Sequence, residues 1–293
     1  MPASFRVEES LGFQPPEKID QYLLDIDDCD EAVLASGTGQ GFFDPKPWRH
    51  TGASIGFIDD VKGDVCSAFE LEPDPRLQDT RIKITLNQFH VERYPGRGRH
   101  RILCEFSGKN QIARATEEVR FAVSGEAADR DSSGISGKPI FMGLTVGADG
   151  VSFEGRSINV RSDTDDTILS VLQSETFRDG LALASRLQPA IKPFAGLALG
   201  VVKMVASRSR NFQVHNFTLG LDFTNNATSA RLRHGTYAVV QSNTPLDWAK
   251  YRCRDGALVE KGSEVSLPLN YMLFGVAPFS GADEIRATTG SAA

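Results

Sequence analysis

The spacing of apolar residues changes its period twice along this chain of 293 residues. From Thr80 to Val160, apolar and polar residues alternate with the two-residue period of half-buried β-strands. Over about residues 163–210 the apolar residues recur every three or four positions, which is typical of helices. The two-residue period returns from Phe217 onward. This order lacks the βαβ alternation of a parallel sheet, so we expect one mainly β, antiparallel β-sandwich over residues 79–280.

Local irregularities in the alternation predict where strands bend and turn. In the segment 82–91 the alternation slips by one residue, and a bulge near Asn87 and Gln88 explains the slip. The pairs Asp149–Gly150 and Asp255–Gly256 lie between alternating runs. Asp-Gly at such a place is a strong turn and hairpin signal.

The helical interlude predicts an α-helical hairpin inserted in the sandwich at about residues 163–210. Pro189 interrupts the pattern, and Pro193 suits the first turn of a second helix. Gly196 and Gly200 lie four residues apart on one face of that helix. Small residues at this spacing would allow the two helices to approach closely.

The two ends of the chain lack a clear period. Residues 1–78 are rich in turn signals, so we expect an irregular N-terminal arm packed on the sandwich. Phe42, Phe43 and Trp48 are large enough to anchor such an arm. Residues 281–293 are small and polar, and we expect a disordered tail.

Charge and cysteine content restrict the compartment and the partners. The formal net charge is −6, which disfavours a general nucleic-acid coat because such a surface should be basic. The four cysteines form no Cys-x-x-Cys motif, and the N-terminal sequence does not have the pattern of a secretory signal. We therefore expect a cytoplasmic protein with free thiols.

Strong catalytic motifs are absent from the sequence. There is neither a Gly-x-Ser-x-Gly nucleophile motif nor a phosphate-binding loop. His90 and Glu92 have the His-x-Glu spacing of zinc deaminases, but that chemistry needs two thiolates close together, and Cys104 stands alone. We therefore predict no catalytic residue, no metal and no cofactor. A hydrolase site around His90, Glu92 and Cys104 is retained as an alternative.

Two acidic segments follow predicted strands. They are Asp129–Asp131 and Asp163–Asp166. Acidic loops at one end of a sandwich can bind calcium through hard oxygen ligands. This is also the logic of C2-type membrane modules, which the expected architecture resembles, although no C2 sequence motif is present. We describe the expected sandwich as C2-like or jelly-roll-like.

The segment from Arg93 to Arg101 contains four arginines and no carboxylate. Its simplest interpretation is the charged tip of a hairpin. Arginines carry forked hydrogen-bond donors that suit phosphate and carboxylate groups. Arg97, Arg99 and Arg101 are therefore the predicted anion- or partner-binding residues.

Together these patterns favour a non-catalytic binding or scaffold protein that presents sandwich loops and the helical hairpin to a macromolecule. The expected partner is another protein or a second copy of this chain; nucleic acid is not expected. A membrane-acting effector is the first alternative, either binding anionic lipid, with or without calcium, or forming pores through the helical hairpin. The hydrolase described above is the second alternative.

Overall fold

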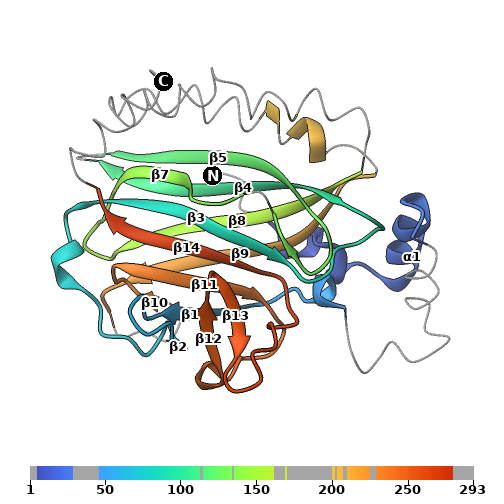
Figure 1. Ribbon diagram of the computed structural model, residues 1–293. Coiled ribbons are helices and arrows are strands. Elements are labelled where there is room, and N and C mark those ends of the chain that lie inside the picture. Colours follow the sequence, from blue (N-terminus) through green and yellow to red (C-terminus); the bar gives the residue numbers. More distant parts are fainter. Residues whose placement is uncertain are drawn as a thin grey trace, which may run out of the picture.

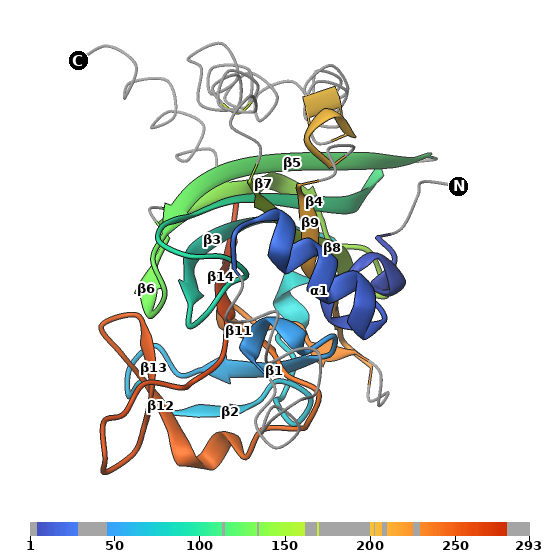
Figure 2. The ribbon, with the colours of Figure 1, turned by 90° about the vertical axis from the view of Figure 1, so that its right-hand side faces the viewer.

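Two mostly antiparallel β-sheets pack face to face in the protein, which is mainly β (Figures 1 and 2). The expectation of an antiparallel two-sheet structure is thereby confirmed. The computed structural model describes residues 5–28, 46–112, 115–133, 135–161, 169, 200–201, 203–206, 210–224 and 229–279.

The larger sheet has seven strands in the order β2-β1-β11-β14-β3, with β6 and β7 both pairing with β3. All of its pairs are antiparallel. Its strands are β1 (Ala53–Ile58), β2 (Val65–Ser67), β3 (Arg81–Val91), β6 (Asp131–Ser132), β7 (Lys138–Thr145), β11 (Gly235–Gln241) and β14 (Tyr271–Pro278).

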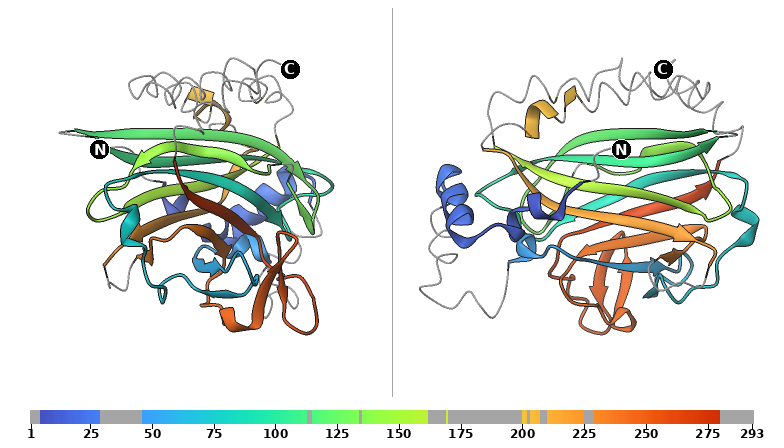
Figure 3. Two further views of the ribbon diagram at one scale, coloured as in Figure 1. Left: turned by 60° about the vertical axis from the view of Figure 1, so that its left-hand side comes forward. Right: turned by 180° about the vertical axis from the view of Figure 1, so that it is seen from behind.

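The smaller sheet has five strands in the order β10-β9-β8-β4-β5, and only the short β10 runs parallel to its neighbour. A separate two-stranded hairpin, β12–β13, projects from the sandwich below the sheets in Figure 3. The strands are β4 (His100–Ile112), β5 (Ala115–Ala127), β8 (Val151–Val160), β9 (Phe212–Asp222), β10 (Ala230–Arg231), β12 (Tyr251–Arg254) and β13 (Ala257–Glu260).

The slip of phase in β3 is a bulge, as the sequence predicts. Along β14, Leu273 pairs with Gln88 and the next residue, Phe274, pairs with Leu86, so Asn87 has no opposite residue. The Asp255–Gly256 pair turns the β12–β13 hairpin with positive φ angles at both residues, as expected. Asp149–Gly150 also turns the chain, but it joins β7 to β8, which belong to different sheets.

The expectation of an irregular N-terminal arm is wrong for part of residues 1–78. β1 and β2 lie within this range and are integral strands of the seven-stranded sheet, because β1 pairs with β11 along its whole length. Trp48 is buried, as predicted, whereas Phe42 and Phe43 lie outside the described residues. The helices of this region are η1 (Val7–Glu9), η2 (Leu11–Phe13), α1 (Pro16–Asp25), η3 (Pro47–Arg49) and η4 (Pro75–Leu77). A further short helix, η7 (Trp248–Lys250), precedes β12.

Most of the expected helical hairpin at 163–210 lies outside the described residues, as does the tail 281–293. Within the described part of the chain, α1 is the only helix of seven residues or more. Gly200 is exposed there, which does not agree with a tight helix contact at this residue. No helix in the described ranges is long and apolar enough to cross a membrane.

The space between the sheets is filled by an aromatic cluster. Phe106, Phe153 and Phe217 come from the five-stranded sheet, and Phe274 comes from the seven-stranded sheet. The Phe153 ring lies 5.4 Å from the Phe274 ring and 6.2 Å from the Phe217 ring, both at steep angles. Edge-to-face contacts of this kind add to the stabilisation from burial, so this cluster joins the two sheets.

Near the β3–β4 connection the interior becomes polar. Gln241 Nε2 donates to the His50 carbonyl at 2.6 Å, and Gln241 Oε1 accepts from Asn270 Nδ2 at 3.0 Å. His215 on β9 is buried beside them, with Nε2 3.3 Å from the Gly52 carbonyl. Burial lowers the pKa of His215 to about 4, so this ring is neutral at pH 7.

The buried His215 should make stability fall in mild acid. Its folded pKa of about 4 lies below its unfolded value of 6.5, so the unfolded chain binds more protons between these pH values. We expect wild type to lose about 3 kcal/mol relative to His215→Gln as the pH falls from 6.5 to 4. Urea unfolding of both proteins across this range measures the difference. If the free energies of unfolding of the two proteins changed in parallel with pH, the prediction would be contradicted. Subtracting one pH profile from the other removes the contributions of other groups, such as His90.

Candidate functional site: the arginine loop

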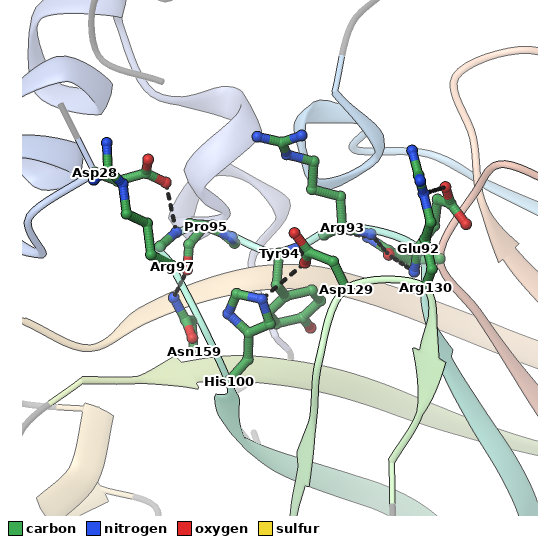
Figure 4. A network of polar contacts seen from close by, with 12 residues as sticks. Asp28, Glu92, Arg93, Tyr94, Pro95, Arg97, His100, Asp129, Arg130 and Asn159 are labelled. Carbon is green, nitrogen blue, oxygen red and sulfur yellow. Dashed lines mark hydrogen bonds and ion pairs between the residues drawn. The ribbon is translucent and has the colours of Figure 1, made fainter. Parts of the chain in front are cut away.

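Residues 92–99, which we call the arginine loop, connect β3 to β4 (Figure 4). β3 belongs to the seven-stranded sheet and β4 to the five-stranded sheet, so the loop crosses from one sheet to the other. The expected hairpin tip is therefore wrong, because β4 pairs with β5 and β8 rather than with β3. The backbone of such a crossover leaves both hydrogen-bonded ladders, and its buried amides need other partners.

Asn270, just before β14, holds the start of the loop. Its Oδ1 accepts hydrogen bonds from the backbone N–H groups of Glu92 and Arg93 at 2.9 and 3.1 Å. Its Nδ2 donates to the carbonyl of Arg93 at 3.1 Å. Because Asn270 is buried and also bonds Gln241, these contacts fix the loop to the seven-stranded sheet.

Asp129 and His100 hold the middle of the loop. Asp129 Oδ1 accepts from the N–H of Tyr94 at 3.1 Å and lies 2.8 Å from His100 Nε2 (Figure 4). Partial burial of Asp129 opposes ionisation, but the hydrogen bonds from His100 and Tyr94 prevail and lower its pKa. Tyr94 itself is buried and bonds the Ser157 hydroxyl on β8.

The hydrogen bonds of His100 determine its tautomer. Arg161 Nη2, which can only donate, lies 3.2 Å from His100 Nδ1, so Nδ1 accepts and the proton is on Nε2 toward Asp129. Both ring nitrogens are thus occupied, and the ring is fully buried. This Asp-His pair positions the backbone and has no nitrogen available to a substrate.

Arg161 lies beneath the loop and is in contact with Gly96. Its guanidinium donates to the carbonyls of Pro95 at 3.0 Å and Arg97 at 3.3 Å. A Cβ on Gly96 would lie 1.6 Å from Arg161 Nη2, and the φ of Gly96 is +99°. Glycine is therefore required here both for its backbone conformation and for the space that Arg161 occupies.

The C-terminal end of α1 lies against the other side of the loop. The N–H of Gly96 donates to Asp28 Oδ2 at 2.8 Å. Asn159 Nδ2 on β8 donates to the carbonyl of Pro95 at 2.8 Å and to the Tyr22 hydroxyl of α1 at 3.0 Å. The loop backbone is consequently bonded to both sheets and to the N-terminal region.

The predicted binding residues are distributed unequally around this backbone. Arg97 and Arg99 are exposed, and Arg99 Nε lies 3.4 Å from Glu126 Oε2. Arg101 is half-buried on β4. Of the three predicted residues, Arg97 and Arg99 are therefore the ones that are accessible to solvent.

Sequence reasoning missed two arginines at this site. Arg130 was part of a segment interpreted as acidic, yet its exposed side chain lies 3.4 Å from Glu92 Oε1 beside the loop. The pairing of β6 with β3, which brings Arg130 here, has no local sequence signal. Arg161 likewise follows β8, far from the loop in sequence.

The residues of the hydrolase alternative do not form one site. His90 Nε2 lies 3.5 Å from Glu92 Oε2, and the His90 ring stacks on Tyr271 with centroids 4.7 Å apart. Burial lowers the pKa of His90 despite the carboxylate of Glu92. Cys104 is on the other sheet in the hydrophobic core, and burial raises the pKa of its thiol. A protonated, buried thiol is a poor nucleophile.

Of the two acidic segments, Asp129–Asp131 lies within the described residues and Asp163–Asp166 does not. Asp129 is committed to His100 and Tyr94. Across the described ranges, no three His, Cys, Asp or Glu side chains are grouped closely enough to hold a metal.

Comparison of the chain with models of protein families, with curated proteins and with solved structures finds no match. The interpretation of the site therefore rests on its geometry.

Gly96 and Gly98 provide a matched pair of substitutions. Both have positive φ, but a Cβ at Gly98 has no atom within 4 Å among the described residues. We expect Gly98→Ala to cost about 1 kcal/mol from backbone strain alone. Gly96→Ala should cost about 3 kcal/mol, because it also displaces Arg161 from the carbonyls of Pro95 and Arg97. Equal losses in urea unfolding would show that Arg161 does not hold the loop.

Proposed function

We propose that this protein is a non-catalytic binding protein of the cytoplasm, and that its arginine loop recognises an acidic segment of a partner protein. The observation that carries the proposal is the combination of exposed arginine side chains with a backbone fixed on both sides. The described cysteines Cys66, Cys104 and Cys253 are free thiols, which supports a reducing compartment.

The fixed backbone favours binding because it reduces the entropy that is lost when a loop is ordered in a complex. Asn270, Asp129, Asn159 and Arg161 already hold the loop in the free protein. A partner that binds Arg97 and Arg99 would therefore not have to order the loop backbone.

The ion pairs that Arg99 and Arg130 make are weak and can be exchanged for a partner's carboxylate. Arg99 and Glu126 are both more than half exposed and make a single contact of 3.4 Å. The Arg130–Glu92 contact has the same length. Exposed pairs of this kind contribute little, whereas a partner carboxylate can accept both arms of a guanidinium. An acidic peptide segment matches this chemistry.

We further propose that the sandwich is C2-like or jelly-roll-like, and that residues 163–210 form a helical hairpin offering a second binding surface. The chain passes repeatedly between the two sheets, at β3–β4, β5–β6 and β7–β8, which supports the first point. Leu169, Val201 and Val205 are buried in the main core cluster, which supports packing of this segment on the sandwich.

The test uses a loop variant that carries both Arg97→Ala and Arg99→Ala. It is compared with a control variant that removes two exposed arginines elsewhere. The control is Arg76→Ala with Arg254→Ala, which changes the net charge equally. Proteins captured from native lysate by each form are quantified by mass spectrometry, and affinity is then measured with the captured partner. We expect the loop variant to bind about tenfold more weakly than wild type and the control to bind equally well. The difference between wild type and the loop variant should be smaller at high salt.

Two results would count against the proposal. Equal capture by the loop variant would remove the arginine loop as the site. Binding to vesicles of anionic lipid that depends on Arg97 and Arg99, without a captured protein, would instead support the membrane-acting alternative.

A further inference from the structure

A second candidate site, separate from the arginine loop, lies on the outer face of the five-stranded sheet. The N-terminal segment lies against this sheet, because η1 and η2 contact β9 and Tyr22 of α1 packs on Phe212 at the start of β9. A pocket of about 320 Å³ remains between them. This volume is within the lower range of small-molecule sites in proteins.

A bulge in β9 directs polar groups toward the pocket. Ser157 pairs with His215 and the next residue, Ile158, pairs with Gln213, so Val214 is the extra residue. His215 lines the interior between the sheets, whereas Gln213 lines the pocket outside. Bulges often redirect side chains at functional sites in this way.

The side chain of Arg156 on β8 is held by an ion pair with Glu105. Its Nε and Nη2 both lie 2.8 Å from Oε2 of Glu105, which is fully buried, and the Phe5 ring covers its guanidinium. Among the described residues its Nη1 makes two long contacts, 3.4 Å to Gln213 Oε1 and 3.9 Å to Glu9 Oε2. This edge of the guanidinium is therefore able to donate to a ligand.

Together with Arg156, the other lining residues give the pocket two positive charges, two negative charges and an apolar surface. Lys18 supplies a second cation, while Glu8 and Glu9 supply two carboxylates. Ile158 and Phe212 contribute apolar surface, and Lys18 Nζ lies 5.5 Å from the centre of the Phe212 ring. A simple anion would be repelled by the glutamates, and a simple amine by Arg156 and Lys18.

We propose that this pocket binds a free α-amino acid with an apolar side chain. The carboxylate of the ligand accepts from Arg156 and Lys18, and its ammonium group donates to Glu9. Its side chain lies on Ile158 and Phe212. The proposal does not depend on the function of the arginine loop.

Isothermal titration calorimetry with leucine and with phenylalanine tests this site. We expect saturable binding to the full chain, and at least roughly tenfold weaker binding of leucinamide and of N-acetyl-leucine, each of which lacks one charge. No saturable heat with either amino acid up to about 10 mM would overturn the proposal. Equal affinity for leucine and its two derivatives would also overturn it.

Variants locate the binding within the pocket. Glu9→Gln and Lys18→Met change exposed side chains outside the Glu105 ion pair, and each should weaken leucine binding roughly tenfold. Glu17→Gln is the control, because Glu17 is exposed on α1 but does not line the pocket. Unchanged binding by both pocket variants, with melting temperatures like wild type, would place any binding elsewhere and reject the proposal.

Discussion

The need to satisfy buried backbone groups where the chain crosses between the sheets determines the structure of the arginine loop. A crossover at β3–β4 leaves both ladders, yet Tyr94, Pro95 and Gly96 are buried. Buried backbone N–H and C=O groups without partners are costly, so side chains from several elements must supply them. Asn270, Asp129, Asn159, Arg161 and Asp28 do so.

This solution has a consequence for function. The side chains that hold the loop are mostly buried and already bonded, so they are not available for chemistry. Arg97 and Arg99, which they present, are exposed, and Arg99 makes a contact of 3.4 Å with Glu126. A recognition surface requires charged side chains that can exchange partners, carried on a backbone that is already fixed. The pocket beside Arg156 repeats this principle, since Glu105 fixes the guanidinium from behind while one edge remains open.

Local sequence patterns predict much of the fold and less of the site. The alternation in β3 and its slip at Asn87 follow directly from side-chain parity, because burial on one face imposes a two-residue period. The sequence pattern does not predict β1 and β2, because they are short and surrounded by turn residues. β1 is stabilised by pairing with β11, nearly 200 residues away in sequence, and β2 by pairing with β1. The arginine segment was located, but its rigidity depends on Asn270 and Arg161, which only the tertiary structure brings to it.

Amide hydrogen exchange at the arginine loop tests this account most directly. If the loop is fixed as described, the N–H groups of Arg93, Tyr94 and Gly96 should exchange about as slowly as those in the middle of β3, because each donates a hydrogen bond to a side chain. The exposed Gly98 should exchange much faster and serves as the internal reference. Exchange of all four at the rate of an unstructured chain would contradict the account, since the arginines would then lie on a mobile tip.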